Sequence, residues 1–278
     1  MAGRLVLCPT PLGNLEDITL RVLRTLRECD VIFAEDTRVS AVLLRAHNID
    51  KPVQSFHERV AARRIDALRT LLAAGKTVAM VSDAGMPGIS DPGIEMIRAA
   101  RAAGAAIEVL PGPSAVPSAV VLSGFDASRF RFDGFPPRKP GPRAAYLAGL
   151  VREPACTVLY EAPVRMRALL DDIERELGDR RIFVLREYTK KFEQQVLGSA
   201  AEARAAISWP ARGEFTVVIE GAPNDAPSAE ISPAIRSAVR ALLAGGASVS
   251  AVARALHGIT SVSKRALYEL AQEEADRE

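Results

Sequence analysis

The sequence predicts an α/β protein made of two α/β halves, with a small helical domain at its end. Three observations predict this class. Up to about residue 110, short apolar runs alternate with segments of helical period, which is typical of a mostly parallel sheet covered by helices on both faces. In the second half apolar runs follow one another directly, which indicates antiparallel pairing. The last 45 or so residues carry helical periodicity alone.

The first half is expected to hold five strands and four helices. Short apolar runs predict the strands Arg4–Cys8, Val31–Ala34, Val53–Ser55, Thr77–Val81 and Ile107–Leu110. Apolar residues at helical spacing predict the helices Thr19–Glu28, Val39–His47, Glu58–Ala74 and Pro92–Ala103. Asp91 before Pro92 is a start signal, since an N-cap acceptor precedes a proline at the first helical position.

A stretch rich in Phe, Arg and Pro, from Phe125 to Pro142, separates the two halves. The second half is expected to hold a helix at Val164–Leu177 and strands at Thr157–Tyr160, Arg181–Arg186, Gln194–Leu197 and Phe215–Glu220. A linker at Ala222–Pro233 precedes three helices, at Ala234–Ala244, Ser248–Leu256 and Thr260–Gln272. We therefore expect domains at residues 1–115, 116–222 and 233–278.

Composition restricts the classes of protein that fit. The net charge is +2, from 36 basic and 34 acidic side chains, and this sum alone does not support a nucleic-acid partner. The three cysteines are widely spaced, which argues against a disulfide framework and a zinc ribbon. The N-terminal apolar stretch is too short for a signal peptide, and the longest uncharged run, Val109 to Phe125, contains three prolines. We expect a soluble, cytoplasmic protein that does not enter a membrane.

Four strand ends in the first half open into loops of unusual composition. These loops are Thr10–Asn14, Glu35–Arg38, Ser82–Gly93 and Pro111–Ser114. In an open parallel sheet, ligands bind outside the carboxyl ends of the strands. Proline stiffens such loops, and glycine lets a ligand approach the backbone closely. Each loop alone is compatible with a tight turn, but four of them at one edge favour a binding site.

Several common catalytic motifs are missing from the sequence. It contains neither Gly-x-Gly-x-x-Gly nor Gly-x-x-x-x-Gly-Lys-Ser/Thr, which disfavours a dinucleotide-binding domain and an NTPase. The three histidines occur without a Gly-x-Ser-x-Gly or His-Glu-x-x-His motif, and no cluster has the spacing of metal ligands. We expect neither a histidine-based hydrolase nor a bound metal.

Charged side chains at strand ends are the candidates for chemistry. Asp83 follows a buried strand, where its carboxylate can accept protons from a ligand's hydroxyl or amino groups or brace the loop as an Asx turn. Glu35–Arg38 contains two carboxylates and a guanidinium, which fit either a functional group or a local ion pair. Tyr160–Glu161 and Arg186–Lys191 end two strands of the second half and suit either a cleft or a solvated edge.

Seven segments occur in order along the chain: TPLGNLEDITLRVL, AEDTR, SDAGMPGISDPG, LPGPSA, GFPPRK, LYEAPVR and REYTKKFE. Segment by segment they resemble the ribosomal RNA small subunit methyltransferase I (RsmI) family, and the resemblance covers essentially the full length. AEDTR and SDAGMPGISDPG best separate this family from other members of its superfamily. The resemblance implies the tetrapyrrole-methylase (class III) fold, with a cofactor cleft between the two α/β halves.

The resemblance also implies a reaction. S-adenosylmethionine (SAM) would donate a methyl group to the ribose 2′-oxygen of a cytidine in the decoding region of 16S rRNA, within the 30S subunit, and the protein would be a cytoplasmic homodimer. The residues that match the family's cofactor pocket are Pro9, Thr10, Pro11, Gly13, Asp83, Gly85, Met86, Pro87, Pro113, Ser114, Ala115, Tyr160 and Glu161. Met86 stands where family members often have threonine, so a hydroxyl is missing at that position.

Methyl transfer to an oxygen requires positioning and the removal of one proton from a weakly acidic hydroxyl. Asp36, Glu187 and Lys190 are the candidates for a general base or a cationic stabiliser, since they follow strand ends that would face the cleft. We expect Asp36 and Arg38 to orient the ribose, and Lys190 to stabilise the alkoxide.

Two regions carry a basic excess that the net charge conceals. Residues 126–152 hold six basic and two acidic side chains, and residues 233–270 hold five and one, so each region carries +4. Four aromatic residues interleave with the first set, which suits base stacking and phosphate contact but also inward packing. The candidate RNA contacts are Arg129, Arg131, Arg138, Lys139, Arg143, Lys264 and Arg265.

The terminal helices have helix-turn-helix proportions, with Thr260 or Ser261 as the cap of the last helix. They suit ribosome or RNA docking, DNA binding through residues such as Ser263, or dimer packing. Two other functions stay open: a tetrapyrrole or diphthine-type methyltransferase of the same fold, and a DNA-binding regulator that senses SAM.

Overall fold

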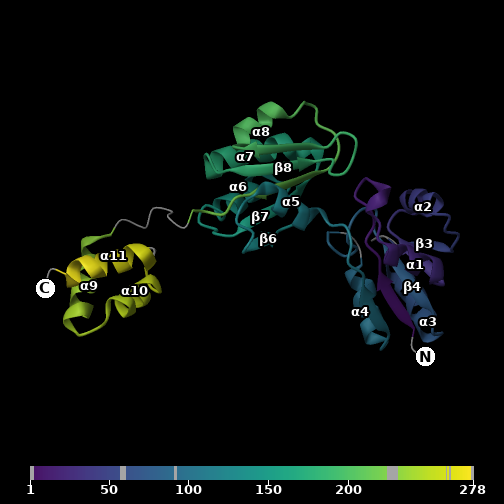
Figure 1. Ribbon diagram of the computed structural model, residues 1–278, viewed down its shortest axis with the longest axis horizontal. Helices are drawn as coiled ribbons and strands as arrows, with labels where there is room; N and C mark the ends of the chain where they lie inside the picture. The colour runs from purple at the N-terminus through teal and green to yellow at the C-terminus, as the bar shows by residue number, and fades with distance from the viewer. Residues whose placement is uncertain are drawn as a thin grey trace. The chain divides into compact units, whose positions relative to one another are not determined.

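The computed structural model describes residues 3–56, 61–90, 93–223, 231–260, 262 and 264–276 (Figure 1). The chain forms two compact units. The larger unit comprises residues 1–148 and 155–220, and the smaller unit comprises residues 149–154 and 221–278. The larger unit contains both β-sheets, and the smaller one contains the last three helices. None of the helices in the described residues is long and apolar enough to cross a membrane.

The first sheet is parallel throughout, as the alternation of strands and helices predicted. Its order is β3-β2-β4-β1-β5. The strands are β1 (Arg4–Leu7), β2 (Val31–Ala34), β3 (Val53–Ser55), β4 (Thr77–Val81) and β5 (Ala106–Val109). Because β1 lies between β4 and β5, the chain leaves β1 and β4 toward opposite edges of the sheet. This reversal places the loops after β1 and β4 at the position where open α/β sheets bind ligands.

Helices cover both faces of this sheet. On one face α1 (Leu20–Glu28) and α2 (Thr37–Ala46) share a core with alternate strand residues such as Val6. On the other face α3 (Ala61–Ala73) and α4 (Ile94–Ala102) share a core with residues such as Leu7. A short 3-10 helix, η1 (Leu15–Asp17), follows the first loop. The helix start signal at Asp91 and Pro92, and the expected first turn of α3, lie outside the described residues.

The second sheet has the order β6-β7-β10-β8-β9. Its strands are β6 (Phe130–Phe132), β7 (Cys156–Glu161), β8 (Ile182–Arg186), β9 (Gln194–Gly198) and β10 (Phe215–Ile219). The expected antiparallel pairing is confirmed for β7 to β10, whereas β6 pairs with β7 in parallel. The stretch between the halves is therefore part of the second sheet, and the three-residue β6 within it was too short to give a strand signal.

Four helices accompany the second sheet: α5 (Ala115–Ser123), α6 (Pro140–Ala148), α7 (Pro163–Leu177) and α8 (Ala200–Ala206). Only α7 was expected. Helix α5 contains Pro117 in its first turn, where the missing N–H removes no helical bond, so a residue that suggested a loop is compatible with the helix. Helix α8 is a short alanine-rich segment that starts at a capping box between Ser199 and Glu202.

A buried ion pair joins α6 to α7. Arg143 Nε lies 2.6 Å from Asp172 Oδ2, and the two side chains are only 5% and 7% exposed. Arg143 was expected to contact RNA. This expectation does not fit the structure, because Arg143 lies on the buried side of α6.

The smaller unit is a set of three helices, α9 (Pro233–Ala244), α10 (Val249–His257) and α11 (Lys264–Ala275), around one apolar core. Ser232 and Ser248 cap the first two helices. The last helix begins four residues later than expected, because the Thr260 hydroxyl donates to the Leu256 carbonyl at the end of α10 instead of capping α11. Ser261 and Ser263 lie outside the described residues.

Candidate active site

The loops after β1 and β4 are joined into one platform. The Thr10 N–H donates to the Gly85 carbonyl and the Gly85 N–H to the Thr10 carbonyl, both at 2.9 Å. The Thr10 hydroxyl also donates to the Ser82 carbonyl at 3.0 Å. Gly85 has a φ of +79°, and a Cβ there would lie 3.1 Å from the Leu12 side chain, so this junction requires glycine. The carboxyl ends of the two strands therefore form a fixed surface.

A cavity of about 440 Å³, which we call the Lys190 cavity, opens against this platform. Loops from both sheets of the larger unit line it. The lining residues are Thr10, Pro11, Leu12, Gly13, Leu15, Val39, Ser40, Val42, Leu43, Ser82, Asp83, Ala84, Lys190 and Glu214.

Lys190 is held in the cavity by two carboxylates. Its Nζ lies 3.0 Å from Glu187 Oε1 and 2.8 Å from Glu214 Oε2. Glu214 precedes β10, which runs antiparallel to β8, so the start of β10 lies beside the end of β8, where Glu187 follows. Burial acts to lower the pKa of Lys190, but the bonds to Glu214 and Glu187 outweigh it and raise that pKa. The side chain is therefore a stable cation, suited to stabilising negative charge and unsuited to removing a proton.

Three carboxylates follow β2 and β4, and their environments differ. Asp36 caps α2 by accepting from the Arg38 N–H, and it also pairs with the Arg38 guanidinium. The bond from the Arg38 side chain lowers the pKa of Asp36 to about 2. Asp83 Oδ1 accepts from the Asp36 N–H at 2.9 Å, yet burial and the carboxylates of Asp36 and Glu214 raise the pKa of Asp83. Burial and the Asp83 carboxylate raise that of Glu35. Asp83 is thus a better proton acceptor than Asp36.

Replacing Asp83 by asparagine is expected to stabilise the fold near neutral pH, measured as a rise in Tm. Because the folded-state pKa of Asp83 is raised, the ionised carboxylate costs stability above that pKa, and the cost disappears as protonation proceeds at lower pH. The amide oxygen of the introduced asparagine would keep the acceptor for the Asp36 N–H. The gain should therefore shrink as the pH falls through the raised pKa.

Asp36→Asn is the matched control with the opposite sign. The pKa of Asp36 is lowered, so its stabilising contribution is present above the unfolded-state pKa and is lost as the pH falls toward about 2. This variant should lower Tm near neutral pH. A lower Tm for Asp83→Asn as well would show that the Asp83 carboxylate is not under electrostatic strain.

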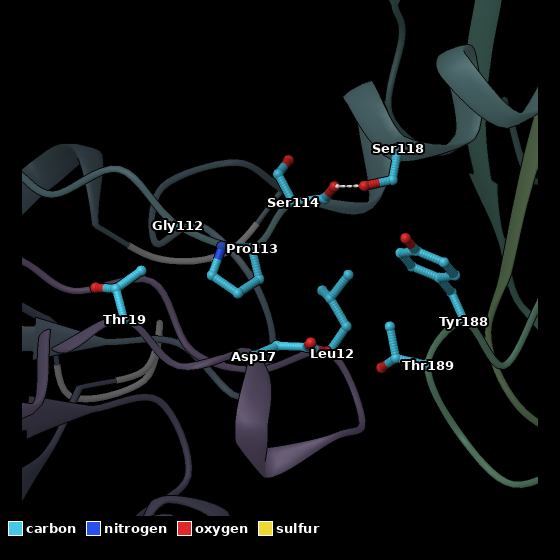
Figure 2. Close-up of a pocket in the computed structure, with 9 residues that line it drawn as sticks. All are labelled: Leu12, Asp17, Thr19, Gly112, Pro113, Ser114, Ser118, Tyr188 and Thr189. Carbon is cyan, nitrogen blue, oxygen red and sulfur yellow. Dashed lines mark hydrogen bonds between the residues drawn. The ribbon is translucent and has the colours of Figure 1, made fainter.

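A second cavity of about 280 Å³, the Tyr188 cavity, is lined by Leu12, Asp17, Thr19, Gly112, Pro113, Ser114, Ser118, Tyr188 and Thr189. Figure 2 shows Tyr188 and Thr189 opposite Pro113, with the Ser118 hydroxyl donating to the Ser114 carbonyl at 2.9 Å. Gly112 lies against Pro9, and a Cβ there would come within 2.8 Å of the Pro9 side chain. The loops after β1 and β5 therefore meet on one side of this cavity.

Residues 187–193, which we call the Lys190 loop, contribute to both cavities. Glu187 and Thr189 have φ values of 51° and 64°, a conformation that costs non-glycine residues roughly 1–3 kcal/mol each. Such strain persists only where the surroundings enforce it. Here the Asn14 N–H donates to the Thr189 hydroxyl at 3.1 Å, and a Cβ on Gly13 would collide with the Lys190 side chain. Glycine at position 13 lets the two loops approach.

The structure brings together six of the residues expected at the cofactor: Thr10, Pro11, Gly13 and Asp83 line the Lys190 cavity, and Pro113 and Ser114 line the Tyr188 cavity. Pro9 packs against Gly112, and Gly85 forms the backbone hydrogen bonds to Thr10. Met86 and Pro87 follow Gly85 in the loop after β4, and Ala115 begins α5. Tyr160 and Glu161, at the end of β7, are not among the residues that line the two described cavities. The Tyr160 ring packs against Phe132, with centroids 4.9 Å apart.

Glu161 is a buried carboxylate with one unsatisfied oxygen atom. Its side chain is 0% exposed and its Oε1 lies 2.5 Å from Arg165 Nη2. Among the residues that the structure describes, Glu161 Oε2 and Arg165 Nη1 have no hydrogen-bond partner. Buried polar atoms are normally satisfied. The end of β7 therefore holds a buried acceptor and a buried donor that described residues leave unsatisfied.

Sequence reasoning missed several lining residues. Tyr188 and Thr189 lie inside a segment that was singled out for Glu187 and Lys190, so the segment itself was their signal. Glu214 could have been found from the antiparallel pairing, because a residue that precedes β10 must lie beside the residues that follow β8. Leu12 lies inside the first loop. Ser118 had no signal, since α5 was not expected.

The expected RNA contacts have different surroundings. Arg129, Arg138 and Lys139 are exposed, and Arg131 is exposed beside Asp133, with a nitrogen-to-oxygen distance of 2.9 Å. Lys264 and Arg265 begin α11, and their side chains lie outside the description. In the smaller unit, Arg236 and Arg240 pair with Glu274, which neutralises part of the expected basic excess.

The described part of the chain contains no group of three or more His, Cys, Asp or Glu side chains that could hold a metal ion. The three cysteines, Cys8, Cys29 and Cys156, are buried and free. Burial raises the pKa of the Cys29 thiol to about 11. The site therefore offers carboxylates, an ammonium group and backbone groups from described residues.

Comparison with known proteins extends these observations. The sequence profile of the family described as Tetrapyrrole (Corrin/Porphyrin) Methylases matches residues 4–204. The methyltransferase CobJ has the same fold, with a TM-score of 0.60 and 20% identity over 80% of this chain and 95% of that one. Diphthine synthase, at 15% identity, gives a TM-score of 0.60 over 78% and 90%. The chain is a methyltransferase of the tetrapyrrole-methylase class.

Proteins with similar sequences identify the family within this class. A protein of Thermotoga maritima named ribosomal RNA small subunit methyltransferase I is 46% identical over 79% of this chain and 99% of its own length. A protein of Synechocystis with the same name is 41% identical over 99% of each chain. This chain belongs to the ribosomal RNA small subunit methyltransferase I family.

Proposed function

We propose that this protein transfers a methyl group from SAM to the ribose 2′-oxygen of a cytidine in the decoding region of 16S rRNA, acting on the 30S subunit. The observation that carries the proposal is the high identity, over nearly their full length, to two relatives named for methylation of small-subunit rRNA. The two cavities at the carboxyl ends of β1, β4 and β5 supply a site for the donor and the acceptor.

Two features of the larger unit fit SAM. The glycine contacts at Gly13 and Gly112 let the loops at the cavities approach one another closely. Outside the residues that line the cavities, Glu161 Oε2 is a buried acceptor without a partner among described residues, which suits a cationic or N–H-bearing ligand. SAM supplies an electrophilic methyl group when bound. We assign its binding to the loops at Thr10–Gly13 and Pro113–Ala115, to Asp83–Pro87, and to Tyr160–Glu161 at the end of β7.

The Lys190 cavity supplies the groups that the acceptor hydroxyl needs. Asp83, whose pKa is raised, accepts the proton of the 2′-hydroxyl, and Lys190 stabilises the negative charge that develops on the oxygen. Glu187 and Glu214 hold the ammonium in place. In this proposal Asp36 acts with Arg38, as expected, and is not the general base: it fixes Arg38, whose side chain is 89% exposed and can orient the ribose through its phosphate.

RNA binding would use exposed cations outside the cavities. Arg129, Arg138 and Lys139 lie on or beside β6 and α6, and Arg131 lies among them. From their position in the sequence, we add Lys264 and Arg265, which begin α11 in the smaller unit. Phosphate contacts of this kind position a substrate without reading its sequence. We include a homodimer in the cytoplasm in the proposal.

The test is to incubate the protein with SAM labelled in its methyl group and one of four acceptors: 30S subunits, naked 16S rRNA, DNA, or a porphyrinogen. Label in the 16S rRNA of the 30S subunit supports the proposal. Label in the porphyrinogen would identify a tetrapyrrole methylase, and SAM binding without transfer, together with retention of DNA, would identify a regulator. Either result would contradict the proposal.

A further inference from the structure

Phe192 is an exposed aromatic residue next to the active site. Phe192 is 70% exposed, and the Lys191 Nζ lies 5.7 Å from the centroid of its ring. Single exposed apolar residues are common on protein surfaces. This one lies on the Lys190 loop, whose residues line both cavities.

Phe192 lies at the tip of a turn whose base reaches the cavities. The Glu193 N–H donates to the Lys190 carbonyl at 3.0 Å, which closes a four-residue turn with Lys191 and Phe192 at its centre. Lys190, the first residue of the turn, lines the Lys190 cavity, and Thr189 lines the Tyr188 cavity. The ring is therefore carried within a few residues of both cavities.

The loop that carries the ring is held firmly. The Glu187 N–H donates to the Glu214 carbonyl, the Glu214 N–H to Glu187 Oε1, and the Thr189 N–H to Glu193 Oε2, at 2.8 to 3.0 Å. Two residues of the loop have left-handed backbone conformations, which persist only when surrounding contacts enforce them. A fixed loop keeps the ring in solvent, where no gain from burial accounts for its position. A loop that is already rigid loses little conformational entropy when a partner binds to it.

Building on the proposed function, we propose that Phe192 is a stacking platform for an unpaired base of the rRNA adjacent to the target nucleotide, with Lys191 beside it for the phosphate. A ribose hydroxyl can enter a cavity of about 440 Å³ only if its nucleotide leaves the helical stack. The neighbouring base then loses a stacking partner, and an aromatic ring replaces it regardless of the identity of the base. Phe192 would thereby determine whether substrate enters in the reactive position.

The test compares Phe192→Ala, Phe192→Leu and Phe192→Trp in the full-length protein, with methyl transfer to 30S subunits as the assay. Loss of base stacking should raise the KM for the subunit about 5- to 100-fold in Phe192→Ala, and Phe192→Leu should resemble it. Phe192→Trp should stay within about twofold of the unaltered protein, since it keeps an aromatic face. The kcat at saturating subunit and the Kd for SAM should not change. Val121→Ala, at another position that is 75% exposed, is the control.

Several results would overturn the assignment. They are a KM for Phe192→Ala within about twofold of the unaltered protein, full activity of Phe192→Leu, a weaker Kd for SAM, or a change in sedimentation that shows the ring packing against a second copy. Failure of the proposed function would be distinct, because the unaltered protein would then label no rRNA in the same assay.

Discussion

Replacing Lys190 by alanine is expected to lower the rate of methyl transfer about 100- to 1000-fold at saturating SAM and 30S subunit. The reason is the loss of a fixed cation near the developing alkoxide, in a cavity where the pKa of Lys190 is raised and its ammonium group is held by Glu187 and Glu214. A single-turnover measurement with labelled SAM reports the transfer step directly.

Two variants separate this electrostatic role from a structural one. Lys190→Arg keeps the positive charge and should retain more activity than the alanine variant. Glu214→Gln removes the more exposed of the two carboxylates, at 73% exposure, and should have a smaller effect than Lys190→Ala. Because Lys190 also contacts Gly13, the Kd for SAM is measured in each variant, and we expect it to be unchanged. Transfer at the original rate in Lys190→Ala would exclude the role.

The largest expected loss of stability comes from Asp172→Ala. This change leaves the Arg143 guanidinium buried between α6 and α7 without its carboxylate partner at 2.6 Å. Removing one member of a buried pair typically costs about 3–5 kcal/mol in the free energy of unfolding. In a unit of this size that corresponds to a fall in Tm of roughly 6–20 °C, measured by calorimetry.

The neighbouring residue provides the matched control. Asp171 is 49% exposed and pairs with Arg204 at the surface, so Asp171→Ala should leave Tm nearly unchanged. The double variant Arg143→Met with Asp172→Leu should recover most of the lost stability, because it removes both buried charges. Equal Tm values for Asp172→Ala and Asp171→Ala would show that burial does not determine the cost.

The first sheet was predictable from the sequence because its three central strands are buried on both faces and its helices are amphipathic. Those patterns are local, so the five strands were found nearly to the residue. The second sheet was predicted less completely. Strand β6 has three residues, α5 carries a proline in its first turn, and α8 is a short alanine-rich segment. These elements are specified by packing in the larger unit more than by their own periodicity.

The candidate site was also predicted from the sequence only in part. The loops after β1, β4 and β5 were identified because parallel strands bring their carboxyl ends together. The Lys190 loop contacts the loop after β1 through the hydrogen bond from the Asn14 N–H to the Thr189 hydroxyl. This contact depends on how the second sheet packs against the first, which local sequence patterns do not predict. The contrast between Asp36 and Asp83 also required coordinates, because it arises from a helix cap and from burial.

The location of each charged side chain is more informative about RNA binding than the net charge of a region. The excess of +4 in residues 126–152 includes Arg143, which is buried, and Arg131, which lies beside Asp133. The corresponding excess in the smaller unit is reduced by Glu274, which lies outside the counted range and pairs with Arg236 and Arg240. The candidate RNA contacts are therefore fewer than the sequence suggested, and Arg129, Arg138 and Lys139 are the ones to test first.

The central claim is methyl transfer to a ribose 2′-oxygen of small-subunit rRNA. It is tested most directly by digesting 16S rRNA from subunits incubated with the protein and methyl-labelled SAM to single nucleosides, and identifying the labelled one. We predict that the label is recovered in 2′-O-methylcytidine, and that an Asp83→Asn protein under the same conditions leaves far less of it. Label on a base instead of a ribose, or in a nucleoside other than cytidine, would contradict the account.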